Sequence, residues 1–136
     1  MKRGFLLVIS LMMIGLAGCG SEISVVVPIP IPIIVPPSIT SSQFSQDTAN
    51  FFVNGSIDFY APDFDLDTMT VSVVDSRGGV AERTVRTLTG VAGRTSGTIS
   101  FSIDYITYRP DTYTFTIYVT DRAGYISNAI YGTFRT

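Results

Sequence analysis

Residues 113–120 alternate strictly between apolar and hydroxyl-bearing side chains. The first set is Tyr113, Phe115, Ile117 and Val119, and the second is Thr114, Thr116, Tyr118 and Thr120. Residues 98–105 repeat the pattern, with an apolar set of Ile99, Phe101, Ile103 and Tyr105. Because successive side chains of an extended strand point to opposite faces, this period of two predicts half-buried β-strands. No segment of residues 38–136 has the period of a helix.

Shorter runs predict five further strands around the same core. Three of them contribute the apolar sets Ile57, Phe59 and Ala61; Met69, Val71 and Val73; and Ile130 and Phe134. Residues 80–89 alternate less cleanly, as an edge strand does, and a weak first strand lies within residues 38–46. The turn signals between strands are Asn54-Gly55, Arg77-Gly78-Gly79, residues 90–97, Arg109-Pro110-Asp111 and residues 121–124. Seven short strands in about 100 residues indicate a single all-β domain.

The N-terminus carries the signature of an exported protein. Lys2 and Arg3 precede an apolar run from Phe5 to Ala17, which is too short to span a bilayer but suits a secretory signal. The run ends in Leu16-Ala17-Gly18-Cys19, which resembles the lipobox of bacterial lipoproteins. The resemblance implies cleavage before Cys19, acylation of Cys19 and attachment to the membrane through that lipid. Gly20 and Ser21 resemble the outer-membrane sorting pattern, so we expect an envelope protein at the outer membrane.

Removing residues 1–18 leaves seven Arg against 11 Asp and Glu, a net charge of −4. Residues 25–37 form an apolar segment in which Pro28, Pro30 and Pro32 forbid a helix and favour polyproline II. This segment is either a semi-rigid stalk or a strip that docks on a partner or on its own domain. The expected organisation is a signal peptide (1–18), a lipidated Cys with a Pro-rich tether (19–37) and one domain (38–136).

The stretch from Ile106 to Phe115 resembles the tyrosine corner of immunoglobulin-like (Ig-like) sandwiches. Pro62-Asp63-Phe64-Asp65-Leu66-Asp67 and the segment from Tyr113 to Gly124 are similar to motifs of bacterial Ig-like, fibronectin-III-like and PKD-like domains. The resemblance implies an antiparallel β-sandwich of about seven strands, in which the Tyr113 hydroxyl bonds to upstream backbone. The Cys pair and Trp of antibody domains are absent from the sequence, so a hydrophobic pair at Phe115 replaces their disulfide.

Missing residue types exclude several kinds of chemistry. The sequence has no His and no Trp, its only Lys is Lys2 and its only Cys is Cys19. His-based triads, Cys/His zinc sites, Schiff-base lysines and internal disulfides are therefore excluded. The net charge of −2 at pH 7 argues against nucleic-acid binding. We expect a protein that is not an enzyme and that needs no cofactor.

One acidic cluster offers an alternative function. Asp63, Asp65 and Asp67 occupy alternate positions, and oxygen ligands in such an arrangement suit Ca²⁺. In an Ig-like topology the loop that follows Tyr118 shares a pole with them, which brings Asp121 close. These four residues are candidate calcium ligands of a calcium-dependent adhesion module. A solvated loop, with Asp favoured by turn geometry, explains the same residues.

Exposed aromatic residues give the leading functional expectation. Tyr60 and Tyr118 are predicted to face outward, and aromatic side chains on a sheet face stack sugars or anchor proteins. Tyr is also simply common in strands. The sequence therefore predicts a lipid-anchored, non-enzymatic Ig-like envelope module. It would bind a protein or glycan partner, or act as an accessory subunit of an envelope complex.

Overall fold

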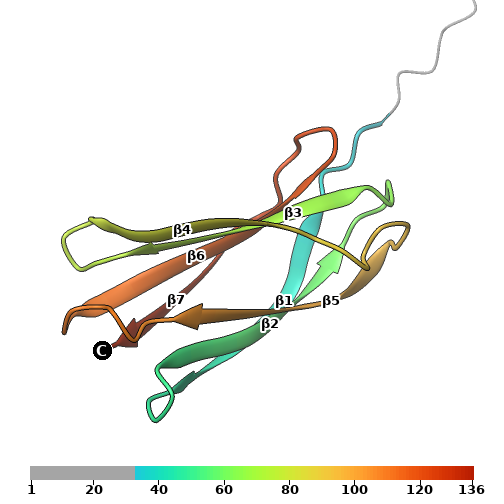
Figure 1. Cartoon of the computed structure of the whole chain (residues 1–136). Coiled ribbons are helices and arrows are strands. Elements are labelled where there is room, and N and C mark those ends of the chain that lie inside the picture. Colours follow the sequence, from blue (N-terminus) through green and yellow to red (C-terminus); the bar gives the residue numbers. More distant parts are fainter. Residues whose placement is uncertain (1–32) are drawn as a thin grey trace, which may run out of the picture. The chain divides into compact units, whose positions relative to one another are not determined.

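The computed structural model describes residues 33–136, which fold into two facing antiparallel sheets (Figure 1). The strands are β1 (Ser38–Asp47), β2 (Phe52–Tyr60), β3 (Leu66–Val74), β4 (Val80–Thr87), β5 (Ser96–Asp104), β6 (Thr112–Asp121) and β7 (Ile130–Arg135). One sheet has the order β1-β2-β5 and the other β4-β3-β6-β7. The predicted all-β sandwich of seven strands is confirmed. The signal peptide, Cys19 and the first part of the tether lie outside the described residues.

The alternating residues form the core as predicted. The apolar residues predicted to face inward within 57–61, 69–73, 99–105 and 113–119 are all buried, whereas Ile130 is only half-buried. The strand β4 is exposed along almost its whole length. The side chains with the least exposure are Val53, Ile57, Phe59, Leu66, Val73, Phe115, Ile117 and Val119. The core cluster of the described residues runs from Ile39 to Phe134, within one compact unit from Ile33 to Thr136. This unit therefore contains a complete core of its own.

The predicted turn at Asn54-Gly55 is wrong, because both residues lie in the middle of β2. Asn54 pairs with Ser45 on one side and Ser102 on the other. A Cβ added at Gly55 would lie 2.5 Å from Cζ of Phe101 and 2.6 Å from the carbonyl oxygen of Gln43. Glycine is required here for close packing rather than for chain reversal. The reversal occurs at residues 48–51, where the Asp47 carboxylate accepts the N–H groups of Ala49 and Asn50.

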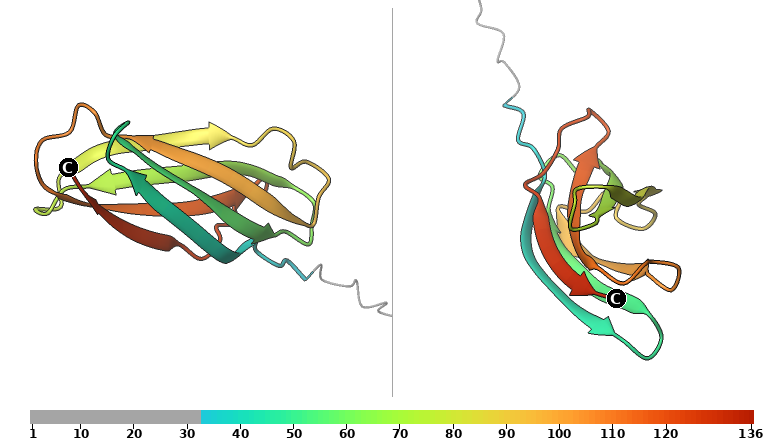
Figure 2. Two further views of the ribbon diagram at one scale, coloured as in Figure 1. Left: turned by 90° about the horizontal axis from the view of Figure 1, so that it is seen from below. Right: turned by 90° about the vertical axis from the view of Figure 1, so that its left-hand side faces the viewer.

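The connections gather at the two ends of the sandwich (Figure 2). We call one end the proximal pole; it consists of residues 33–37 and the loops 61–65, 88–95 and 122–129. The opposite end, the distal pole, consists of the loops 48–51, 75–79 and 105–111 with Thr136. Figure 2 shows the first described residues, coloured light blue, at the proximal pole, whereas the C-terminus lies at the distal pole. Ile33, the first described residue, therefore belongs to the proximal pole.

Candidate functional site

The structure brings the two acidic segments together at the proximal pole. The backbone N–H of Arg122 donates to the carbonyl oxygen of Asp65 at 3.0 Å, and Leu66 pairs with Asp121. The predicted proximity of the loop 61–65 to the loop after β6 is therefore confirmed. These contacts are made by the backbone and require no bound ion.

The carboxylates have different surroundings. Asp63 is exposed, Asp65 and Asp67 are half-buried, and Asp121 is buried. Asp121 accepts the N–H of Tyr125 at 2.8 Å through its side chain, which closes the loop after β6. Within residues 33–136, no group of three or more acidic side chains is arranged to hold a metal ion. Calcium binding by Asp63, Asp65, Asp67 and Asp121 stays a prediction.

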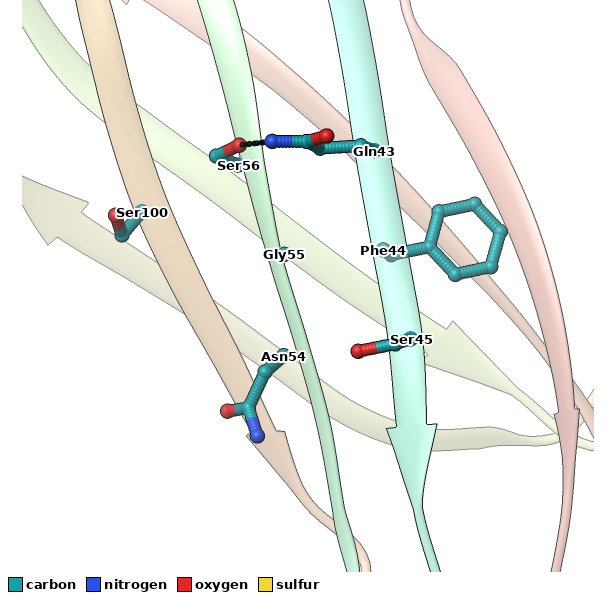
Figure 3. Close-up of a pocket in the computed structure, with 7 residues that line it drawn as sticks. All are labelled: Gln43, Phe44, Ser45, Asn54, Gly55, Ser56 and Ser100. Atoms are coloured by element: carbon teal, nitrogen blue, oxygen red, sulfur yellow. Dashed lines mark hydrogen bonds between the residues drawn. The ribbon is translucent and has the colours of Figure 1, made fainter.

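The outward face of the β1–β2–β5 sheet carries an open hollow of about 400 Å³ (Figure 3). Its lining residues are Gln43, Phe44, Ser45, Asn54, Gly55, Ser56 and Ser100. None of these carries a charge. Figure 3 shows the Phe44 ring turned away toward β7, and its centroid lies 5.0 Å from that of buried Phe115. The hollow is therefore bordered by hydroxyl and amide groups, and its middle is the bare backbone of Gly55.

Hydrogen bonds between strands hold these polar groups in place. Gln43 donates from Nε2 to the Ser56 hydroxyl at 3.2 Å, and the Ser102 hydroxyl donates to Oδ1 of Asn54 at 2.8 Å. Each group keeps further donor or acceptor capacity, because an amide has two donors and a carbonyl, and a hydroxyl accepts as well as donates. The face thus presents an ordered array of neutral hydrogen-bonding groups to solvent.

Asp58 ends this array on the side of the proximal pole. Its carboxylate accepts hydrogen bonds from the hydroxyl groups of Ser41 and Thr98. These two bonds, the first above all, lower the pKa of Asp58 below its ordinary value. Tyr60 lies two residues further along β2 and is 47% exposed, so its predicted outward orientation is confirmed. The same face therefore carries one exposed aromatic ring, at the end of β2 and outside the lining of the hollow.

The opposite sheet presents a second outward face with two tyrosines. Tyr118, which is predicted to face outward, is half-buried, and its hydroxyl lies 3.5 Å from Nη2 of Arg83. Tyr131 is exposed. This face therefore has aromatic groups and a cation. A second hollow of about 410 Å³ is lined from both sheets, by Arg86 of β4 and by Asn54, Gly55, Ser100, Phe101 and Ser102.

Two features were not visible to sequence reasoning. The hollow depends on the register of β1, β2 and β5, and the Asn-Gly pair suggested a turn at its centre. At the distal pole, the Tyr108 hydroxyl donates to the Glu82 carboxylate at 2.7 Å. Burial, and then this bond to Glu82, raises the pKa of Tyr108 above its ordinary value. The partners in both cases are far apart in the chain, so no local pattern reveals them.

No protein-family model matches the chain, and no curated protein matches its sequence. Among solved structures, wild-type OgpA from Akkermansia muciniphila is similar over 74% of this chain and 28% of its own, with 14% identity and a TM-score of 0.56. Catalytically inactive OgpA in complex with an O-glycopeptide substrate is similar over 72% of this chain and 29% of its own, at 16% identity and a TM-score of 0.50.

A putative β-galactosidase from Bacteroides fragilis is similar over 74% of this chain and 17% of its own, at 9% identity and a TM-score of 0.50. The chain thus corresponds to less than a third of the length of OgpA and of the putative β-galactosidase. At these identities the likeness shows a shared β-sandwich fold. In the part of the chain that the structure describes, no helix could cross a membrane.

Proposed function

We propose that this chain is a lipid-anchored, non-enzymatic, Ig-like module of the cell envelope that binds a glycan-bearing partner. The anchor is Cys19, supported by the lipobox-like sequence around it. The binding surface is the outward face of the β1–β2–β5 sheet. The observation that carries the proposal is the uncharged hollow over Gly55, with its ordered hydroxyl and amide groups.

A glycan suits this surface better than an apolar protein epitope. Protein interfaces derive most of their affinity from a few buried aromatic or Arg residues, and the hollow offers none that points outward. Sugar hydroxyls instead need neutral donors and acceptors at fixed positions, as Asn54, Ser56 and Ser100 supply. The fold also occurs in OgpA, which has been solved in complex with an O-glycopeptide substrate, and in a putative β-galactosidase, which adds support at the level of architecture.

The direct test is an NMR titration of ¹⁵N-labelled residues 33–136 with neutral galactosides and O-glycopeptides. We expect the largest amide shifts at residues 43–45, 54–56 and 100–102. Asn54→Ala removes one amide from the hollow and should weaken binding about fivefold, the equivalent of one hydrogen bond. The matched control is Thr116→Ala on the opposite sheet, which should bind like the wild type.

Shifts confined to the β4–β3–β6–β7 face, or no shifts with any of these ligands at millimolar concentration, would contradict glycan binding by the hollow. Affinity purification of the full chain from its native membrane, followed by mass spectrometry, then separates the remaining cases. Recovery of a stable multiprotein assembly without glycan would identify an accessory subunit of an envelope complex.

A further inference from the structure

Exposed apolar side chains gather at the proximal pole. They come from four separate segments: Ile33, Ile34 and Val35 before β1, Tyr60 at the end of β2, Phe64 before β3, and Tyr125 and Ile126 after β6. Ile33 is 87% exposed, Phe64 54% and Ile126 56%. Single exposed apolar residues are common on proteins, but a group at one end of the molecule indicates a contact surface.

Backbone hydrogen bonds hold the supporting loops together. Gly93 donates to the carbonyl oxygen of Phe64 at 3.1 Å, and Arg122 donates to that of Asp65 at 3.0 Å. The Asn128 side chain binds both backbone groups of Ile39, which ties the N-terminal segment to the loop after β6. Figures 1 and 2 show these segments at the same end of the sandwich. The apolar tips therefore share a preformed support.

Phe64 adopts a backbone conformation that bulky residues avoid. Its φ is 59°, in the left-handed region that favours Gly, Asn and Asp. Phe51 has a similar φ of 62°, but its ring packs edge-on against Tyr105 at a centroid distance of 6.0 Å. For Phe64, a strained backbone holds an aromatic ring that is more than half exposed. Such strain, observed first, supports a functional role for the side chain.

We propose that the proximal pole docks on a lipid surface, with Phe64, Tyr125 and Ile126 at the headgroup boundary. Tyr and Phe suit this boundary because their rings are apolar and the Tyr hydroxyl stays hydrated. The apolar residues 33–35 extend the same surface toward the anchor. The pole can contact lipid without an anchor, but the proposed lipid on Cys19 would strengthen that contact.

The length of the intervening chain makes a weak contact sufficient. Residues 20–32 join Cys19 to Ile33 and span at most about 50 Å when fully extended. A lipid on Cys19 would hold the pole near the bilayer at a millimolar effective concentration. The domain would then rest on the membrane, and its sheet faces would remain accessible from the side.

The charges around the pole select the kind of lipid. Asp63, Asp65 and Asp67 slightly outnumber Arg94 and Arg122, the cations of the same loops. Anionic membranes attract basic surfaces, so anionic lipid would add little to the binding of this pole. The pole therefore fits a zwitterionic surface, and docking should depend on apolar burial and respond weakly to salt.

The test uses unlipidated residues 33–136, because this unit contains its whole core. Partition is measured by sedimentation with vesicles of phosphatidylcholine, alone or mixed equally with phosphatidylglycerol, at millimolar lipid. We expect partition that is no stronger on the mixed vesicles and that salt leaves nearly unchanged. A spin-labelled lipid should broaden the amide signals of residues 62–66 and 122–127 and spare those of residues 76–79 and 105–111.

The test variant is Phe64→Asn with Ile126→Asn, and the matched control is Val80→Asn with Ile106→Asn at the distal end. Both control side chains are exposed to a similar or greater degree. The test variant should lose partition about tenfold or more, and the control should keep it.

Equal loss in both variants, broadening at the distal pole, or no partition would overturn the proposal. Self-association through Phe64 without vesicles would assign the surface to a second copy instead. Because no lipid on Cys19 is involved, failure here leaves the proposed anchor and glycan binding untouched.

Discussion

The Tyr113 side chain closes the connection between β5 and β6. Its hydroxyl donates to the carbonyl oxygen of Arg109 at 3.0 Å, which confirms the hydrogen bond that the sequence resemblance implies. The Thr136 hydroxyl donates to the same oxygen at 2.6 Å. The Tyr113 ring also stacks on Phe134 with a centroid distance of 5.5 Å. One carbonyl therefore has two donors, and one ring ties this connection to β7.

Tyr113→Phe keeps the ring and deletes one of the two donors. Since Thr136 still serves the Arg109 carbonyl, we expect a loss of about 1 kcal/mol in the free energy of unfolding. Thr136→Val alone should cost a similar amount or less. The double variant leaves the carbonyl unpaired and should cost more than the sum of the two single changes. Urea denaturation of all four proteins measures this coupling, and strictly additive losses would contradict the shared carbonyl.

At the scale of elements, two side-chain amides join the edges of β1 and β7. Asn128 accepts the N–H of Ile39 at 2.8 Å and donates to its carbonyl oxygen at 3.0 Å. Near the other end of the strand, Gln46 binds both backbone groups of Arg135. Between them, the Phe44 ring fills the space above Gly132. A Cβ added at Gly132 would lie 2.7 Å from Cζ of Phe44. Side chains thus connect edges that no backbone ladder joins in the described sheets.

Local patterns predicted the strands well because each alternating run reports its own buried face. The same patterns gave a wrong turn at Asn54-Gly55, where a ring from β5 and a carbonyl from β1 require a glycine within a strand. The candidate hollow was missed for that reason. The left-handed φ of Phe64 was also unpredictable, because Phe is among the residues least suited to it. What the sequence does not reveal depends on contacts between distant segments.

Asn128→Ala should loosen β1 at its first residues. The change leaves the N–H and carbonyl of buried Ile39 without their partner, and we expect a cost of about 1–3 kcal/mol. Asn128→Asp is the informative comparison, because a carboxylate still accepts the N–H but no longer donates to the carbonyl. Hydrogen exchange should accelerate at residues 39–42 in the Ala variant and less so in the Asp variant. Acceleration that is uniform over both sheets would contradict a local stabilisation of β1 by Asn128.

At the scale of the whole molecule, the two proposed surfaces lie on different parts of the described domain. The hollow over Gly55 lies on a sheet face, whereas the exposed apolar residues lie at the end where the N-terminal segment arrives. A contact at that end leaves the sheet face free. Glycan binding and membrane docking, as proposed, are therefore compatible in one molecule, and variants at Asn54 and at Phe64 should act independently.

Membrane retention of the full chain tests the anchor itself. The apolar run from Phe5 to Ala17 is too short to span a bilayer, so the proposed attachment depends on acyl chains on Cys19. Cys19→Ser should give an unprocessed precursor or a protein released by a carbonate wash, and it should not incorporate labelled palmitate. Phe64→Asn is the matched control: it weakens docking at the proximal pole but keeps the lipid, so it should resist the wash. Equal retention of Cys19→Ser and wild type would show that another attachment holds the protein, because docking through three side chains alone is reversible.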